Sequence, residues 1–221
     1  MAVVHRTTMT PGKLELLASW LPAQPWYQDP GAGRAPQPAR AGGFRLDDPQ
    51  GEVGIEFMAV RDGAGDRPVT YHVPLTYRGA PLDGAEHALI GTSEHGVLGR
   101  RWIYDGAHDP VLVERLYALV RGEAEPQAQS ESDTPDPSVT GWYAGAGGPG
   151  PVTILGVSAG PEATDVLVRT PSGRPTIGIR RILRPEPAGE DTAERPLGHV
   201  TAEWTLPDAT SARGRYAVVL A

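Results

Sequence analysis

Cysteine and asparagine are both missing from this chain of 221 residues, and Lys13 is its only lysine. Without cysteine the protein has no disulfide, no thiolate zinc site and no cysteine nucleophile. Lysine and asparagine commonly hold nucleotide phosphates and magnesium in phosphoryl transfer. With one lysine and no asparagine, the chain has few of the residues that this reaction uses. Aromatic residues make up only 6% of the chain.

Basic charge is also scarce, because 20 Lys+Arg stand against 27 Asp+Glu, a formal net charge of −7. Such an acidic chain lacks the basic face that nucleic-acid binding requires. The longest apolar stretches, at 111–120 and 152–157, are too short or too polar to cross a bilayer, and residues 1–10 lack the apolar run of a signal peptide. We therefore expect a cytoplasmic protein with no nucleic-acid partner and no membrane contact.

Glycine and proline are abundant, with 28 and 23 residues, which predicts many turns, short strands and few long helices. Apolar side chains at helical spacing predict a first helix that begins with Thr10 as N-cap and Pro11 in the first position. Trp20, Trp26 and Tyr27 follow closely. They are expected either to dock this helix as an aromatic plug or to stack on a ligand.

Apolar residues in alternation then predict a series of strands. These fall at 44–46, 53–60, 67–78, 88–91 and 99–104. The second and third are expected to form a hairpin, as are the last two, and Pro74 favours an edge or a bulge. Asp109 and Pro110 carry the capping and first-position signals of a second helix.

Residues 122–137 contain several acids and no large apolar side chain, which predicts an acidic flexible linker. The chain is thereby divided into domains at 1–121 and 138–221. The second part is expected to be mostly antiparallel, with short strands separated by turns. The strands are predicted at 139–143, 152–157, 165–170, 176–183, 199–206 and 214–220, and the turns at 147–150, 159–161, 171–173 and 188–191.

Motifs that carry catalytic chemistry are lacking. The six histidines include no pair at the i,i+2 or i,i+4 spacing of a metal site, so we expect no metal. Neither glycine-rich stretch, at 96–99 or 141–150, has the lysine or the following helix that a phosphate loop needs. The arginine pairs 100–101 and 180–181 can grip an anion bidentately or serve as surface charge.

The first half of the chain carries a series of short motifs in a family-specific order. They lie at 16–27 (LLASWLPAQPWY), 44–48 (FRLDD), 54–56 (GIE), 73–79 (VPLTYRG), 89–96 (LIGTSEHG) and 102–106 (WIYDG). In this order the segment resembles the N-terminal cap domain of actinobacterial maltokinases, over roughly residues 1–121. The chain beyond the linker has no secure match.

The resemblance implies an α+β fold in which a helix packs on a curved antiparallel sheet, a cystatin-like arrangement. In maltokinases the cap precedes a bilobed kinase that phosphorylates maltose with ATP, on the route from trehalose through maltose 1-phosphate to glycogen and other α-glucans. This chain departs from that plan, because without asparagine it cannot contain the H-x-D-x-x-x-x-N catalytic loop. Its length is also about half of what a cap and two kinase lobes require.

We therefore expect a stand-alone, non-catalytic binding or regulatory protein without catalytic residues or cofactors, although enzymatic activity is not excluded. Its expected partner is a maltokinase, another α-glucan enzyme or a sugar. A fragment or remote relative of a maltokinase that is active with ATP, and a carbohydrate-binding module, stay open as alternatives.

Two sets of residues are predicted to make the contacts. Aromatic and basic side chains of the cap-like half form the first set: Trp20, Trp26, Tyr27, Tyr77, Arg78, Arg100, Arg101 and Trp102. The second set is a stacking platform for carbohydrate in the C-terminal half: Trp142, Tyr143 and Trp204.

Overall fold

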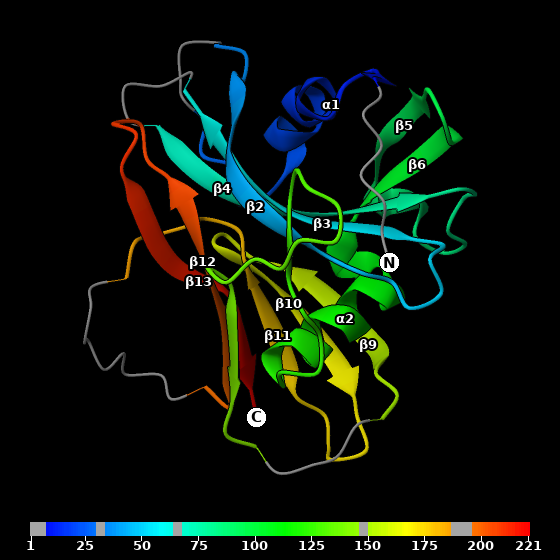
Figure 1. Cartoon of the computed structure of the whole chain (residues 1–221), viewed down its shortest axis with the longest axis vertical. Helices are drawn as coiled ribbons and strands as arrows, with labels where there is room; N and C mark the ends of the chain where they lie inside the picture. The colour runs from blue at the N-terminus through cyan, green and yellow to red at the C-terminus, as the bar shows by residue number, and fades with distance from the viewer. Residues whose placement is uncertain (1–7, 30–33, 64–67, 146–149, 187–195) are drawn as a thin grey trace.

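Strands dominate the computed structural model, which describes residues 8–29, 34–63, 68–145, 150–186 and 196–221 (Figure 1). The strands are β1 (Met9–Thr10), β2 (Pro38–Leu46), β3 (Gly54–Asp62), β4 (Val69–Arg78), β5 (Leu89–His95), β6 (Gly99–Asp105), β7 (Gln127–Ala128), β8 (Thr140–Tyr143), β9 (Thr153–Ala159), β10 (Ala163–Arg169), β11 (Thr176–Arg180), β12 (Gly198–Thr205) and β13 (Ser211–Leu220). The helices are α1 (Lys13–Trp20) and α2 (Pro110–Val120), with short 3₁₀ turns η1 (Leu21–Ala23), η2 (Glu86–Ala88) and η3 (Gly106–His108).

The described strands belong to one antiparallel sheet. Their order is β1-β5-β6-β4-β3-β2-β12-β13-β11-β10-β9, with β7 beside β2 and β8 beside β12. The two halves of the chain meet in this sheet where Trp204 of β12 pairs with Gly42 of β2. The expectation of a mainly antiparallel β chain with only short helices is therefore confirmed.

The predicted strand pairs form as expected. β3 pairs with β4, β5 with β6, and β10 with β11 through the turn at 171–173. The predicted turn residues 147–149 and 188–191 lie outside the described residues. The predicted strands of the C-terminal half are all present, with bounds that shift by only a few residues.

Pro74 lies inside the sheet, at a place where β4 changes its neighbour. Before Pro74, the N–H of His72 donates to the carbonyl of Arg181 at 2.9 Å. After it, the ladder with β6 begins at Leu75. Proline has no N–H to donate, so this gap between two partners accommodates it without the loss of a ladder bond.

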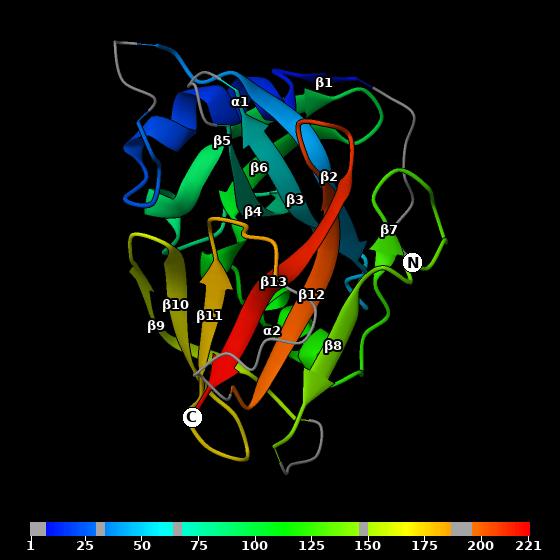
Figure 2. The same ribbon diagram turned by 90° about the vertical axis from the view of Figure 1, so that its left-hand side faces the viewer.

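Helix α2 lies between the strands of the two halves, as Figures 1 and 2 show. It starts as predicted, since the Asp109 carboxylate accepts the N–H of Val111 and Pro110 takes the first position. Its apolar face belongs to a core cluster that includes Phe44 of β2 and Tyr216 of β13. The same helix is therefore buried by both halves of the chain.

Helix α1 begins later than the sequence predicts. It starts at Lys13 with Gly12 as N-cap, and the Glu15 carboxylate accepts the Gly12 N–H at 3.3 Å. Thr10 belongs to β1 and does not cap the helix, because it pairs with Glu94 of β5. The predicted apolar face of this helix is present in part. Its residue Leu17 packs in a second core cluster with side chains of β3 and β4.

Residues 122–137 lie against the sheet. β7 pairs with residues 44 and 45 of β2, and Gln127 is buried. The Arg45 guanidinium donates to the carbonyls of Ala128 and Glu131. The segment is thus in contact with the N-terminal half, and the division into domains at 1–121 and 138–221 stays a prediction.

Within the described ranges, neither helix is long and apolar enough to cross a membrane.

Candidate functional site

The only lysine of the chain is paired with a buried carboxylate. Lys13 Nζ lies 2.6 Å from Glu56 Oε2, and Glu56 also accepts the Tyr77 hydroxyl at 2.5 Å and the Gln129 amide at 2.6 Å. Burial raises the pKa of Glu56, but the charge of Lys13 and these three hydrogen bonds outweigh it and hold the pKa below its usual value. Lys13 and Tyr77 are therefore occupied in holding α1 on the sheet.

Three predicted aromatic residues form one cluster around Tyr71. Trp26 lies 5.6 Å from both Trp20 and Tyr71 between ring centroids, and Tyr27 lies 5.7 Å from Tyr71. Trp26 is only 1% exposed. The Tyr27 hydroxyl donates to Asp62 at 2.8 Å. Burial and this carboxylate raise the Tyr27 pKa. Trp26 thus belongs to the core, and only the half-buried Trp20 and Tyr27 reach the surface.

The predicted arginines are distributed over separate places. Arg78 binds Asp109 bidentately at 2.6 and 2.7 Å, which links β4 to the start of α2. Arg100 pairs with Glu94 at 2.8 Å on the exposed face of the β5–β6 hairpin. Arg101 donates to the carbonyl of Leu98 at 2.5 Å in the same hairpin. Arg100 and Arg101 are therefore near the surface, whereas Arg78 is engaged in the fold.

Trp102 lies opposite Arg78 in the pairing of β4 with β6. It packs against a small cluster of Ala85, Ala88 and Tyr104 and is half-buried. The structure therefore brings Arg78, Arg101 and Trp102 to neighbouring positions of β4 and β6, apart from the Trp20, Trp26 and Tyr27 cluster.

One arginine of the predicted pair 180–181 has a structural role. Arg181 is 0% exposed, and its Nη2 donates to both oxygens of Asp105 at 2.8 and 2.6 Å, while its Nε donates to Thr164 at 2.8 Å. Its guanidinium also lies 5.1 Å from the Trp26 ring centroid. Arg181 therefore ties the C-terminal half to the end of β6. It does not face solvent to bind an anion.

The three predicted stacking rings of the C-terminal half do not share one face. Trp142 is 50% exposed and stacks on His199, with 5.3 Å between centroids. The neighbouring Tyr143 points to the opposite face of β8, where its hydroxyl lies 3.0 Å from that of Tyr117. Trp204 is 3% exposed and packs near Tyr216. Trp142 alone offers an exposed ring.

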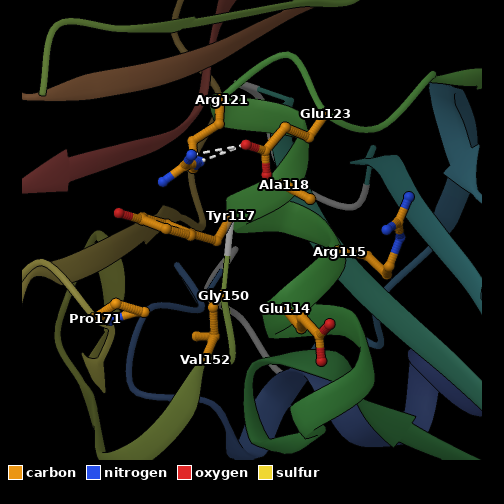
Figure 3. A pocket seen from close by; sticks show the side chains of 9 residues that line it. All are labelled: Glu114, Arg115, Tyr117, Ala118, Arg121, Glu123, Gly150, Val152 and Pro171. Carbon is orange, nitrogen blue, oxygen red and sulfur yellow. Dashed lines mark hydrogen bonds and ion pairs between the residues drawn. The ribbon is translucent and has the colours of Figure 1, made fainter. Parts of the chain in front are cut away.

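A pocket that the sequence analysis missed lies beside α2 (Figure 3). Its volume is about 480 Å³. The Arg121 guanidinium pairs with Glu123 at 2.7 Å and lies 5.8 Å from the centroids of both Tyr117 and Tyr143. The lining residues are Glu114, Arg115, Tyr117, Ala118, Arg121, Glu123, Gly150, Val152 and Pro171.

The described lining of the pocket includes polar side chains that are able to hydrogen-bond a ligand, but these side chains do not form a recognisable catalytic set. The hydrogen bond to Tyr117, together with burial, raises the pKa of the neighbouring Tyr143 to about 12, so the Tyr143 hydroxyl stays protonated at neutral pH. The lining residues come from positions 114 to 171. Helical spacing identifies only the buried face of α2, so the sequence held no signal for this pocket. Among the described residues no group of three or more histidine, aspartate or glutamate side chains is placed to hold a metal ion.

Comparison with known families gives one match. The family model of the maltokinase N-terminal cap domain matches residues 20–109, from the end of α1 to the N-cap of α2. No curated protein matches the chain. The match covers β2 to β6 with the Trp20 cluster and the Arg78–Trp102 region, and it leaves out α2, the pocket and the C-terminal strands. Residues 20–109 are thus similar to the maltokinase N-terminal cap domain, and the resemblance that the sequence motifs indicate is confirmed for this part of the chain.

Proposed function

We propose that this chain is a non-catalytic binding or regulatory protein that acts with a maltokinase-type enzyme of α-glucan metabolism. The cap match at residues 20–109 is the observation that carries the proposal. Together with α1, which ends where the match begins, the matched strands β2 to β6 would form the helix-on-sheet, cystatin-like arrangement that the family resemblance implies.

The state of Lys13 supports a role without phosphoryl transfer. A kinase site needs an amine free to contact nucleotide phosphates, together with side chains that hold magnesium. Lys13 Nζ is instead held 2.6 Å from Glu56 and lies 5.4 Å from the Tyr77 ring centroid. Releasing it would leave the buried Glu56 carboxylate without its counter-charge.

The β5–β6 hairpin is the proposed contact surface. Val97 and Leu98 at its turn are 62% and 46% exposed, and the predicted contact residues Arg100 and Arg101 follow them on β6. The buried core of a protein interface is more apolar than the rest of the surface, and arginine is enriched in interfaces.

A pull-down with a purified maltokinase tests this proposal. We expect the enzyme to be retained, and we expect the double substitution Val97→Asp and Leu98→Asp to weaken retention at least about tenfold. Leu155→Asp is the matched control, because Leu155 is 37% exposed on β9, outside the cap match. No retention, or equal loss in the control, would contradict the proposal.

The kinase alternative has a direct test. With maltose, magnesium and ATP, the purified chain should yield no maltose 1-phosphate. Product formed by the chain alone would show that the reasoning from Lys13 is wrong.

A carbohydrate-binding role is the second candidate, and the exposed Trp142 ring favours it. Calorimetry with maltose, trehalose and glycogen would give binding heat that Trp142→Ala removes. Flat isotherms for all three would remove this candidate, whereas loss of the buried Trp204 is expected to impair folding and would not inform on stacking.

A further inference from the structure

Two histidines that are far apart in the sequence meet at the base of the β5–β6 hairpin. His87 lies in η2, directly before β5, and His108 ends η3, directly after β6. His87 Nε2 lies 3.1 Å from His108 Nδ1. Their ring centroids are 4.6 Å apart and the ring planes are nearly perpendicular, at 87°. They are 21 positions apart in the sequence, so no local spacing rule detects this pair.

The geometry differs from that of a straight hydrogen bond between two imidazoles. A linear N–H···N contact of this length would hold the ring centroids about 5.4 Å apart. The observed 4.6 Å means that the two nitrogens meet at an angle. Two nitrogens that each lie about 2.0–2.1 Å from one metal ion are roughly 2.9–3.4 Å apart at ordinary coordination angles. The 3.1 Å separation falls in that range.

The surroundings leave the pair available to a cation. His87 is exposed, so one side of the pair is open to solvent. His108 is half-buried, and its Nδ1 faces His87 Nε2. Because no third histidine or carboxylate among the described residues joins the pair, water would complete the coordination.

We propose that His87 and His108 form a two-histidine site for a divalent transition-metal ion that prefers imidazole, such as Zn²⁺ or Ni²⁺. The ion would join η2 to η3 and so close the base of the β5–β6 hairpin. This inference is independent of the proposed function, since it rests only on the two rings.

The test uses the tag-free full chain after treatment with EDTA. Titration with ZnCl₂ or NiCl₂ alone is followed by calorimetry and by NMR signals of the histidine rings. We expect saturable one-site binding, with the largest changes at His87 and His108, and a higher melting temperature in the presence of metal. His87→Gln and His108→Gln should each weaken binding about tenfold or more.

His95→Gln is the matched control. His95 lies at the opposite end of the same hairpin, where its Nδ1 accepts the N–H groups of Val97 and Leu98. Its loss should leave metal affinity unchanged. The proposal is overturned by absence of saturable binding at millimolar metal, by ring signals that change only at other histidines, or by unchanged affinity in both His87→Gln and His108→Gln. If a variant fails to fold, the NMR signals of the histidine rings in the unmodified chain still show whether the metal binds at His87 and His108.

Discussion

At the scale of residues, the buried pair of Arg181 and Asp105 places two charges where they depend on each other. Their side chains are 0% and 7% exposed, respectively. We expect Asp105→Asn to destabilise the fold by about 3–5 kcal/mol, because the guanidinium would stay buried without its counter-charge. Urea unfolding measures this. Glu94→Gln, which breaks the exposed pair with Arg100, should change stability by less than about 0.5 kcal/mol. Equal effects of the two substitutions would contradict the argument.

His72 gives the protein a sensitivity to acid. Its ring is fully buried between Phe57 and Tyr216, and burial, helped by the charge of Arg181, lowers its pKa from 6.5 to about 3. Between these pH values the unfolded chain binds a proton that the folded chain does not. Stability should therefore fall as the pH drops below 6.5, by up to about 1.4 kcal/mol per pH unit from this group.

Urea unfolding at a series of pH values measures this dependence. Glu56 acts in the same direction, since its lowered pKa makes folding less favourable as its carboxylate is protonated. The contribution of His72 is therefore taken as the difference between the wild-type slope and that of His72→Phe. A variant as sensitive to acid as the wild type between pH 6.5 and 3 would show that His72 titrates normally.

Several single residues show which features the sequence predicts and which depend on the tertiary structure. The sequence correctly places Asp109 and Pro110 at the start of α2, because a helix cap depends on neighbours in the chain. It gives no means of separating the buried Trp26 from the half-buried Trp20, nor of pairing Arg181 with Asp105 across 76 positions. The candidate site was therefore predicted as residue types, whereas its geometry depends on tertiary contacts.

At the scale of elements, the packing of β8 on α2 requires a glycine. A Cβ at position 141 would lie 1.9 Å from the carbonyl oxygen of Leu119, which is backbone and cannot turn away. We expect Gly141→Ala to push β8 from α2 and to cost at least about 2 kcal/mol of stability. Gly156→Ala in β9 is the control, because a Cβ there meets nothing within 4 Å and should change stability by less than about 0.5 kcal/mol. A neutral Gly141→Ala would mean that β8 is not held on the helix.

Strands could be predicted where apolar residues alternate along the chain, and helix starts could be predicted where a capping residue stands directly before the helix. β3, β4 and the C-terminal strands have alternating apolar residues that identify them directly. β7 could not be predicted, because its two residues lie within an acidic segment with few apolar side chains. They pair with β2 through hydrogen bonds of the backbone. The start of α1 was misplaced because Thr10 and Pro11 carry a cap signal that the pairing of β1 with β5 overrides.

At the scale of the whole molecule, the two halves of the chain share a core. The buried side chains of α2 belong to one core cluster with Phe44 and Phe57 and with residues of the C-terminal strands. Arg181, directly after β11, binds Asp105 at the end of β6. Separating the halves would expose apolar side chains of α2 and leave Asp105 without its partner. The two halves are thus joined by a shared apolar core and by a buried ion pair.

We accordingly expect the full chain to unfold in one cooperative transition, although the sequence divides it at 122–137. Urea unfolding followed by far-ultraviolet circular dichroism and by tryptophan fluorescence should give coincident curves. Trp20, Trp26 and Trp102 report on the first half, and Trp142 and Trp204 on the second, so separate unfolding would split the fluorescence curve. In that case Asp105→Asn would shift only one of two transitions. In a single cooperative unit, it shifts the whole curve to lower urea with an unchanged slope, because removing one buried partner weakens the shared core as a whole.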